Sequence, residues 1–289
     1  DRVSAALRAT FAGSGPLILV PTPTAIDGGE KTVLTAYDDS RKVAVTPPAA
    51  PSTTLWPYAS FGPIGKIAEQ KDIADLDAVF VRFENGVRLT VKPTKFRDDQ
   101  ILIKVRIGHG LLDLPPGAQN PLWSGSAFIE GGLKQISAQD MEQVLNGKIW
   151  NASLGVEDDA FTLSGRTRPD DVSTELQVLA GFATEPGWRP EAFSRIKTYY
   201  GTIHDQLETT TGGVLGRDLS GLLHNGDKRW TFPSRVDIAS ASLDGLKAAV
   251  TDPLSKGEIE VVVVGDITAD KAIAAVAETF GALPPRPGV

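Results

Sequence analysis

The chain has 289 residues, of which 41% are hydrophobic and 22% charged, and its formal net charge is −7. This composition predicts a soluble globular protein, because no run approaches the ~18 apolar residues that would span a bilayer and the acidic balance disfavours binding to nucleic-acid phosphates. The sequence contains no cysteine, which excludes disulfides, thiolate metal ligands and cysteine nucleophiles.

The first forty residues predict a helix, a strand and a second helix. Residues 2 to 11 repeat apolar positions at helical spacing, and a Gly/Pro-rich turn at 13 to 16 separates them from the strand-like run 17 to 20. Asp27 is placed to cap a helix that continues to about Asp39. The first ten residues have no basic or long apolar run typical of a signal peptide, so any export signal is expected outside this chain.

A stretch rich in Pro, Ala, Thr and Ser follows, and residues 43 to 76 are predicted to form a linker. Its aromatic residues Trp56, Tyr58 and Phe61 indicate that the linker lies against a domain surface.

The main domain is predicted to open with a β-hairpin. Residues 78 to 91 alternate around Asn85-Gly86, and Asn-Gly between alternating runs is a strong hairpin signal. A third strand is expected at 101 to 107, and two more on either side of the acidic turn Glu157-Asp158-Asp159.

Helices are expected between and after these strands. They are placed at residues 121 to 130, from Ser137 onward, at 172 to 182 and at 189 to 207. The spacing of Ser137 to Asp140 fits a capping box, and Pro190 is well placed to begin the last of these helices.

The C-terminal region repeats the order seen at the start of the chain. A helix at 243 to 250, a turn at 252 to 257 and a buried strand at 259 to 264 precede an Ala-rich helix headed by Asp270. The two copies lie roughly 240 residues apart, as expected for the end of one domain followed by a whole second one. Strands that precede and interleave with helices predict an α+β fold, a two-layer sandwich with helices packed on one face of a mainly antiparallel sheet.

The three histidines form no local metal motif. His109 lies between two glycines and is expected in a loop without a ligand, although such a position can face a cleft. His204 follows a polar helical stretch and is expected to be exposed, and His224 precedes a turn sequence.

Other site patterns are incomplete. Glu157 to Asp159 lack calcium-loop spacing and predict a solvated turn, and Gly265-Asp266 is followed by neither a dinucleotide fingerprint nor a Walker pattern. The run 209 to 213 predicts a mobile loop, and no G-x-S-x-G elbow occurs.

Four segments, in order, resemble the pitrilysin and insulinase family of zinc metallopeptidases. They are FENGVRLTVKPTKFRDDQILIKVRIGHG (83 to 110), FIEGGLKQIS (128 to 137), FTLSGRTRPDD (161 to 171) and VVVVGDITADKAIAAVAETFGALP (261 to 284). The resemblance implies the sandwich fold of processing peptidases, with residues 1 to 42 as the C-terminal tail of a preceding homologous domain and 77 to 289 as a complete non-catalytic domain.

Active members of that family carry an inverted H-x-x-E-H motif, in which two His bind Zn²⁺ and the Glu acts on its water. Aligned on Ala127-Phe128, the motif falls on Pro121, Ser124 and Gly125, none of which can ligate zinc or accept the proton. The later helix expected to supply the third ligand reads FSRIKTYYGTI (193 to 203), without a carboxylate. We therefore expect no catalytic, cofactor or metal site in this chain.

The resemblance implies a role as part of the wall of a proteolytic chamber in a bacterial, periplasmic or cell-envelope enzyme, whose catalytic domain would hold the zinc. The expected partners are a peptide substrate shared with the catalytic half, and other domains or a second subunit of the same peptidase, with no nucleic acid and no membrane span. Two alternatives remain open: a scaffold subunit without any role in proteolysis, and an unrelated α/β binding domain suggested only by VVVVGD.

Overall fold

The computed structural model describes residues 2–13, 15–44, 55–115 and 121–286. The chain folds as two compact units, Asp1–Thr53 and Thr54–Val289.

The first unit contains the two predicted helices, α1 (Arg2–Thr10) and α2 (Gly29–Ser40). The strand predicted at 17 to 20 is wrong: these residues form no strand. A strand needs a neighbour to complete its backbone hydrogen bonds, and the described part of this unit contains none. Every described side chain of the unit is at least partly exposed.

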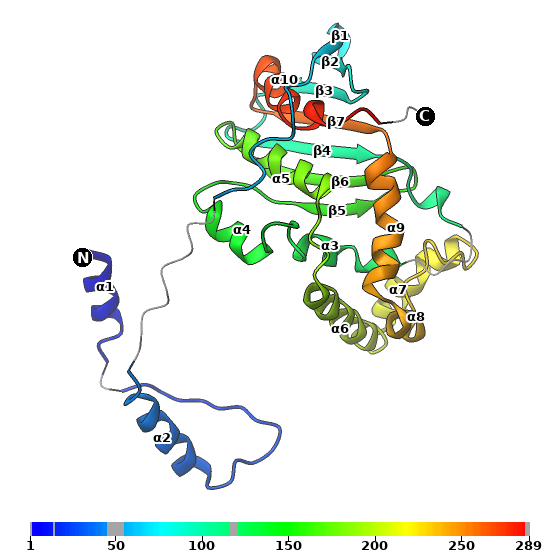
Figure 1. Ribbon diagram of the computed structural model, residues 1–289. Helices are drawn as coiled ribbons and strands as arrows, with labels where there is room; N and C mark the ends of the chain where they lie inside the picture. Colours follow the sequence, from blue (N-terminus) through cyan, green and yellow to red (C-terminus); the bar gives the residue numbers. More distant parts are fainter. Residues whose placement is uncertain (1, 14, 45–54, 116–120, 287–289) are drawn as a thin grey trace. The chain divides into compact units, whose positions relative to one another are not determined.

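The second unit is built on one seven-stranded sheet (Figure 1). Its strands, in the order in which they lie side by side, are β1 (Ile67–Ile73), β2 (Ala78–Phe83), β3 (Arg88–Pro93), β7 (Ile259–Gly265), β4 (Ile101–Ile107), β6 (Phe161–Thr167) and β5 (Ser153–Val156). Only the β3–β7 pair among these strands is parallel. The sheet is therefore mainly antiparallel, as predicted.

The helices of this unit follow the first strands and continue to its C-terminal end. They are α3 (Ser126–Glu130), α4 (Ala138–Val144), α5 (Val172–Thr184), α6 (Pro190–Leu207), α7 (Thr211–Leu223), α8 (Arg235–Ser240), α9 (Leu243–Lys256) and α10 (Ala269–Ala277), with short 3₁₀ turns η1 (Ala74–Leu76), η2 (Leu111–Asp113), η3 (Pro121–Ser124) and η4 (Phe280–Ala282).

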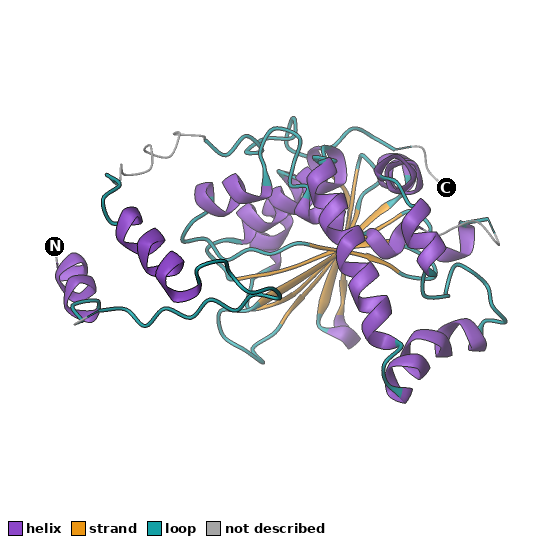
Figure 2. Cartoon of the chain, turned by 90° about the horizontal axis from the view of Figure 1, so that it is seen from below, coloured by secondary structure: helices purple, strands orange, loops and turns teal. Residues whose placement is uncertain are grey.

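The core lies between the sheet and three helices, α5, α9 and α10, which cover the same face (Figures 1 and 2). Alternate residues of the central strands β4 and β7 point into this core and are almost fully buried, while their neighbours are at least partly exposed. This period of two is what a sheet covered on one face requires. The predicted α+β two-layer sandwich is confirmed.

Other predicted boundaries need correction. Residues 67 to 73, assigned to the linker 43 to 76, form the edge strand β1, whose burial pattern gives no alternating signal because six of its seven residues are exposed. Residues 45 to 54 of that linker lie outside the described residues. The turn predicted at 252 to 257 is largely the last part of α9, and the mobile loop predicted at 209 to 213 begins α7, where the Thr210 hydroxyl accepts a hydrogen bond from the Gly213 N–H.

The aromatic residues of the predicted linker lie against the domain, as predicted. The Tyr58 side chain is buried, its hydroxyl donates to Glu185 Oε2 at 3.2 Å, and Trp56 Nε1 donates to Gln177 Oε1 at 3.0 Å. Both partners lie on α5 or directly after it.

The Asn-Gly turn is confirmed between β2 and β3, but Asn85 serves a purpose that hairpin statistics do not reveal. Its amide Nδ2 donates to the carbonyl oxygens of Phe280, Gly281 and Leu283 at 2.9 to 3.0 Å, and its Oδ1 accepts from the Val87 N–H. Of the two turn residues Asn85 and Gly86, only Gly86 has a positive φ, 92°. The side chain thus fixes the hairpin to the segment that follows α10.

A buried carboxyl group on α5 accepts a hydrogen bond from the segment before β5 and lies against β6. Glu175 is fully buried, its Oε2 accepts from the Asn151 N–H at 3.0 Å, and its Oε1 has no hydrogen-bond partner among the described residues. A Cβ on Gly165 would lie 1.6 Å from that oxygen, so β6 requires glycine opposite this side chain. Burial raises the pKa of Glu175 from 4.5 to about 8.

We expect Asn85→Asp to destabilise the protein by about 1–3 kcal/mol, because a carboxylate would face three carbonyl oxygens in place of a donor. Chemical denaturation at neutral pH measures the loss. Glu84→Gln, at the exposed neighbouring position, is the control and should change stability by less than about 0.5 kcal/mol. Equal stability of Asn85→Asp and wild type would contradict the proposed tie.

The raised pKa of Glu175 predicts that stability falls as the pH rises. The unfolded chain releases this proton near pH 4.5 and the folded chain only near 8, so the folded state binds more protons across that window. Glutamine does not titrate, so Glu175→Gln should lose less stability than wild type as the pH rises from about 4.5 to 8. Thermal unfolding from about pH 5 to 8 measures the difference, with the exposed Glu142→Gln as control. Parallel curves for wild type and Glu175→Gln would rule out the buried neutral carboxyl.

Candidate functional site

A cavity of about 730 Å³ lies in the second unit, at the end of the sheet where β4 finishes and β7 begins. Its walls come from the segment 108 to 115, from Trp123 in η3, from Phe161 at the start of β6, and from α9. A volume of this size is within the ~300–1,000 Å³ range of small-ligand pockets.

Helix α9 gives the cavity its space. One side of the helix carries Leu246, Val250 and Leu254, which are 0–3% exposed in the core. The side that lines the cavity carries Gly245, Ala248 and Ala249, which have no side chain beyond Cβ. The helix thus packs firmly on the sheet and leaves room on its other side.

The floor of the cavity is a close contact between two glycines. Gly108 follows β4, has φ 59° and donates its N–H to the Glu258 carbonyl at 2.9 Å. A Cβ on Gly257 would lie only 2.4 Å from the Gly108 Cα. These glycines let the end of α9 touch the segment that follows β4.

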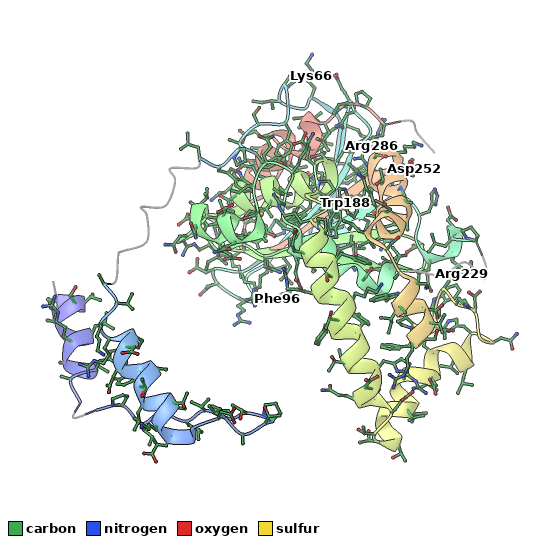
Figure 3. All side chains as sticks on the ribbon, turned by 60° about the horizontal axis from the view of Figure 1, so that its bottom comes forward. Lys66, Phe96, Trp188, Arg229, Asp252 and Arg286 are labelled. Atoms are coloured by element: carbon green, nitrogen blue, oxygen red, sulfur yellow. The ribbon has the colours of Figure 1, made fainter. Side chains whose placement is uncertain are left out.

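Arg229 holds the outer wall in place. Its guanidinium pairs with Asp227 at 2.6 Å and donates to the carbonyl oxygens of Leu112 and Leu114, both at 3.2 Å. The hydrogen bond from Arg229 holds the pKa of Asp227 below its usual range. Figure 3 labels Arg229 together with Asp252 of α9, another residue that lines the cavity.

The other charged groups of the lining also have partners. His109 Nδ1 lies 3.5 Å from Asp113 Oδ2, and Lys256 Nζ lies 2.9 Å from Asp252 Oδ2. His109 is in an exposed loop, as predicted, and it also faces the cavity.

The serines near the cavity serve as structural groups. The Ser242 hydroxyl accepts from the Gly245 N–H at 3.1 Å as the N-cap of α9, and the Ser240 hydroxyl donates to the Asp237 carbonyl at 3.3 Å. Across the residues that the structure describes, no group of three or more His, Cys, Asp or Glu gathers where it could hold a metal ion.

The residues that the sequence alignment places at the family's metal-motif positions lie at η3 and next to α3. Pro121 begins η3, Ser124 ends it and is fully buried, and Gly125 directly precedes α3. The facing helix α6 brings Tyr200 against Trp123, with ring centroids 4.7 Å apart. These residues do not fit a zinc ion, because an aromatic pair and small side chains supply no ligand set.

Burial raises the pKa of the Tyr200 hydroxyl.

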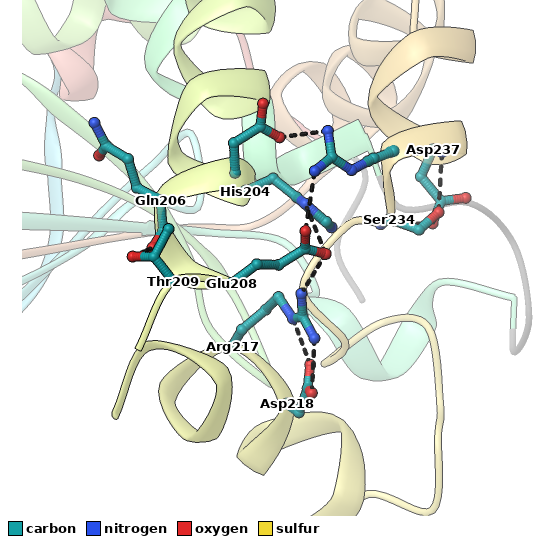
Figure 4. A network of polar contacts seen from close by, with 10 residues as sticks. His204, Gln206, Glu208, Thr209, Arg217, Asp218, Ser234 and Asp237 are labelled. Carbon is teal, nitrogen blue, oxygen red and sulfur yellow. Dashed lines mark hydrogen bonds and ion pairs between the residues drawn. The ribbon is translucent and has the colours of Figure 1, made fainter. Parts of the chain in front are cut away.

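The prediction for His204 is wrong, because this side chain is buried. It lies on α6 where α7 and α8 pack against that helix, and its Nδ1 is 3.6 Å from Glu208 Oε1. Glu208 also pairs with Arg217 and Arg235, both at 3.0 Å, in the network of Figure 4. The polar sequence of α6 did not indicate that α7 and α8 would pack against it and bury His204. Arg235 and the other cations hold the pKa of Glu208 below its usual range.

The acidic turn is confirmed as a surface turn held by cations. Glu157 forms an ion pair with Lys104. Arg106 pairs with both Glu157 and Asp159, each at 2.8 Å. Asp158 accepts from Trp230 Nε1 at 2.9 Å.

Sequence reasoning missed the cavity. Its lining comes from five separate segments, and the small residues of α9 read only as one face of an amphipathic helix. A usable signal was present in Gly108 and Gly110, because closely spaced glycines mark unusual backbone requirements.

No family model matches the chain. Among curated proteins it is similar to the chloroplastic stromal processing peptidase of Pisum sativum, with 22% identity over 232 residues, 77% of this chain but 18% of that protein. The Arabidopsis thaliana counterpart is 23% identical over 199 residues, 66% of this chain and 15% of that protein. The chain thus spans less than a fifth of the length of these relatives.

Solved structures agree on the fold. The periplasmic protease PqqL of Escherichia coli superposes with a TM-score of 0.68 and 16% identity, covering 90% of this chain and 29% of that one. The ferredoxin protease FusC, solved with Arabidopsis ferredoxin, superposes with a TM-score of 0.64 and 16% identity, covering 94% of this chain and 30% of that one. A peptidase M16 inactive domain from Pseudomonas fluorescens superposes with a TM-score of 0.59 and 16% identity, covering 74% of this chain and 52% of that one. The resemblance to the pitrilysin and insulinase, or M16, peptidases is confirmed, and the chain has the fold of their domains.

The glycine contact at the cavity floor predicts that Gly257→Ala is strongly destabilising. The added methyl would overlap the Gly108 backbone, and neither segment can move without disturbing the β4–β7 pair. We expect a loss of about 2 kcal/mol or more in chemical denaturation. Gly216→Ala on α7, where a Cβ would meet nothing within 4 Å, is the control and should be neutral or stabilising. Equal stability of the two variants would refute the close contact.

Proposed function

We propose that this chain is a non-catalytic segment of a longer zinc-dependent metallopeptidase and forms part of the wall of its peptide-binding chamber. The observation that carries the proposal is the likeness of the fold to M16-type domains, among them an inactive one. The sequence alignment that puts Pro121, Ser124 and Gly125 at the metal-motif positions supports it. The Trp123–Tyr200 contact beside them supports a structural use of that region.

Apolar side chains that stay exposed in both units support contact with further domains. No described residue of the first unit is buried, so that unit lacks a core of its own, as expected for the tail of a preceding domain. In the second unit, α7 leaves Leu215, Leu222 and Leu223 between 57% and 74% exposed. Apolar side chains gathered on one helix suit contact with another domain or subunit of the same peptidase.

The partners that we propose are a peptide substrate and the zinc-bearing catalytic half. The solved FusC complex contains ferredoxin, and PqqL is a periplasmic protease. By analogy we place this protein in the bacterial periplasm or cell envelope. No helix among the described residues is long and apolar enough to cross a membrane.

The proposal predicts that this chain alone contains no stoichiometric zinc and cleaves no peptide, whereas the complete protein that contains it does both. Elemental analysis after metal removal and zinc return, with a peptidase assay on both proteins, measures this. Zinc-dependent cleavage by the isolated chain would contradict the non-catalytic role. Two inactive, zinc-free proteins would instead support a scaffold subunit.

A further inference from the structure

We propose that the cavity beside α9 binds a bulky, neutral side chain of a peptide, together with one N–H of its backbone. The inference rests on the proposed function for the choice of a peptide as ligand. The features of the site itself come from the structure alone.

The backbone of α9 lacks one helical hydrogen bond at residues that line the cavity. Pro253 lies within the helix and has no N–H, so the carbonyl oxygen of Ala249 lacks the donor that an α-helix supplies four residues later. Ala249 and Pro253 both line the cavity. A carbonyl at such a position needs a hydrogen-bond donor, and a peptide N–H provides one.

The walls around this acceptor are apolar and aromatic. Trp123 and Phe161 present rings, Leu114 presents an aliphatic group, and the small residues of α9 leave the space between them. Aromatic and branched aliphatic side chains gain most from such a surface, because burial of each is worth more than that of any smaller side chain.

The charges of the lining argue against a charged ligand. Asp113 faces His109, Asp252 pairs with Lys256, and Arg229 pairs with Asp227. The remaining acid, Asp237, accepts hydrogen bonds from Ser234 and lies 3.6 Å from Lys228. A charged side chain would lose hydration in this largely apolar space, where Asp237, Asp252 and Arg229 already pair with other charges.

The test uses blocked pentapeptides of alanine with Phe, Asp or Lys at the centre, added to the wild-type chain labelled with 5-fluorotryptophan. The chain has five tryptophans, and Trp123→Phe identifies the fluorine signal of Trp123. We expect the Phe peptide to shift that signal saturably, and the Asp and Lys peptides to bind at least about tenfold more weakly. No shift of the Trp123 signal, or equal binding of all three peptides, would overturn the proposal.

Variants of α9 separate the two parts of the site. Ala249→Leu fills the cavity and should weaken the Phe peptide about ten- to hundredfold, whereas Thr251→Leu, exposed on the same helix and outside the lining, should not. Pro253→Ala restores a donor to the Ala249 carbonyl and should weaken binding about two- to tenfold. Wild-type affinity in both Ala249→Leu and Pro253→Ala would refute the site.

Failure of the site and failure of the proposed function can be told apart. A complete protein that is a zinc peptidase, beside a chain that binds no peptide at Trp123, would remove the site only. Binding of the Phe peptide at Trp123 in a protein that neither holds zinc nor cuts peptides would keep the site and remove the peptidase role.

Discussion

The antiparallel register of β4 and β7 is the constraint on which the second unit depends. Ile107 pairs with Ile259 at one end and Ile101 with Gly265 at the other, and residues 260 to 265 of β7 also pair in parallel with β3. A strand from the C-terminal region therefore lies between two strands from the first half of the domain. The hairpin, the core helices and the cavity all take their positions from this insertion.

The cavity follows directly from that register. Because Ile107 and Ile259 are opposite, the chain before β7 and the chain after β4 must leave the sheet side by side, and Gly257 and Gly108 allow their backbones to touch. Helix α9 ends at this contact, so its small-residue side is held facing the segment 108 to 115. The space is thus a product of the sheet rather than of a flexible loop.

Local sequence signals predicted six of the seven strands of the sheet and most helices, because these elements carry their own periodicity. The hairpin at Asn85, the capping of α4 by Ser137 and the start of α6 at Pro190 were all visible in the sequence. Burial of His204 and the pairing of β1 were not, because each depends on a distant segment: α7 and α8 in the first case, and β2 in the second. The cavity was missed for the same reason, since tertiary packing alone assembles its walls.

Aromatic side chains occupy the region where the family's metal motif would be expected. Between η3 and α6 the chain places Trp123 against Tyr200, and the ring centroids of Tyr200 and Phe232 are 6.0 Å apart, so aromatic packing extends through this region. Such packing stabilises a domain, and it provides no ligand for a metal ion. Such packing is consistent with the proposed role of the segment in shaping a binding space.

The most direct test of that role is complementation. The complete protein is prepared without the residues of this chain, and its peptidase activity is measured before and after the purified chain is added. The account predicts that the shortened protein keeps its zinc but loses cleavage, and that the added chain restores it in proportion to its concentration. Full cleavage by the shortened protein, with no effect of the added chain, would contradict a role in the chamber wall.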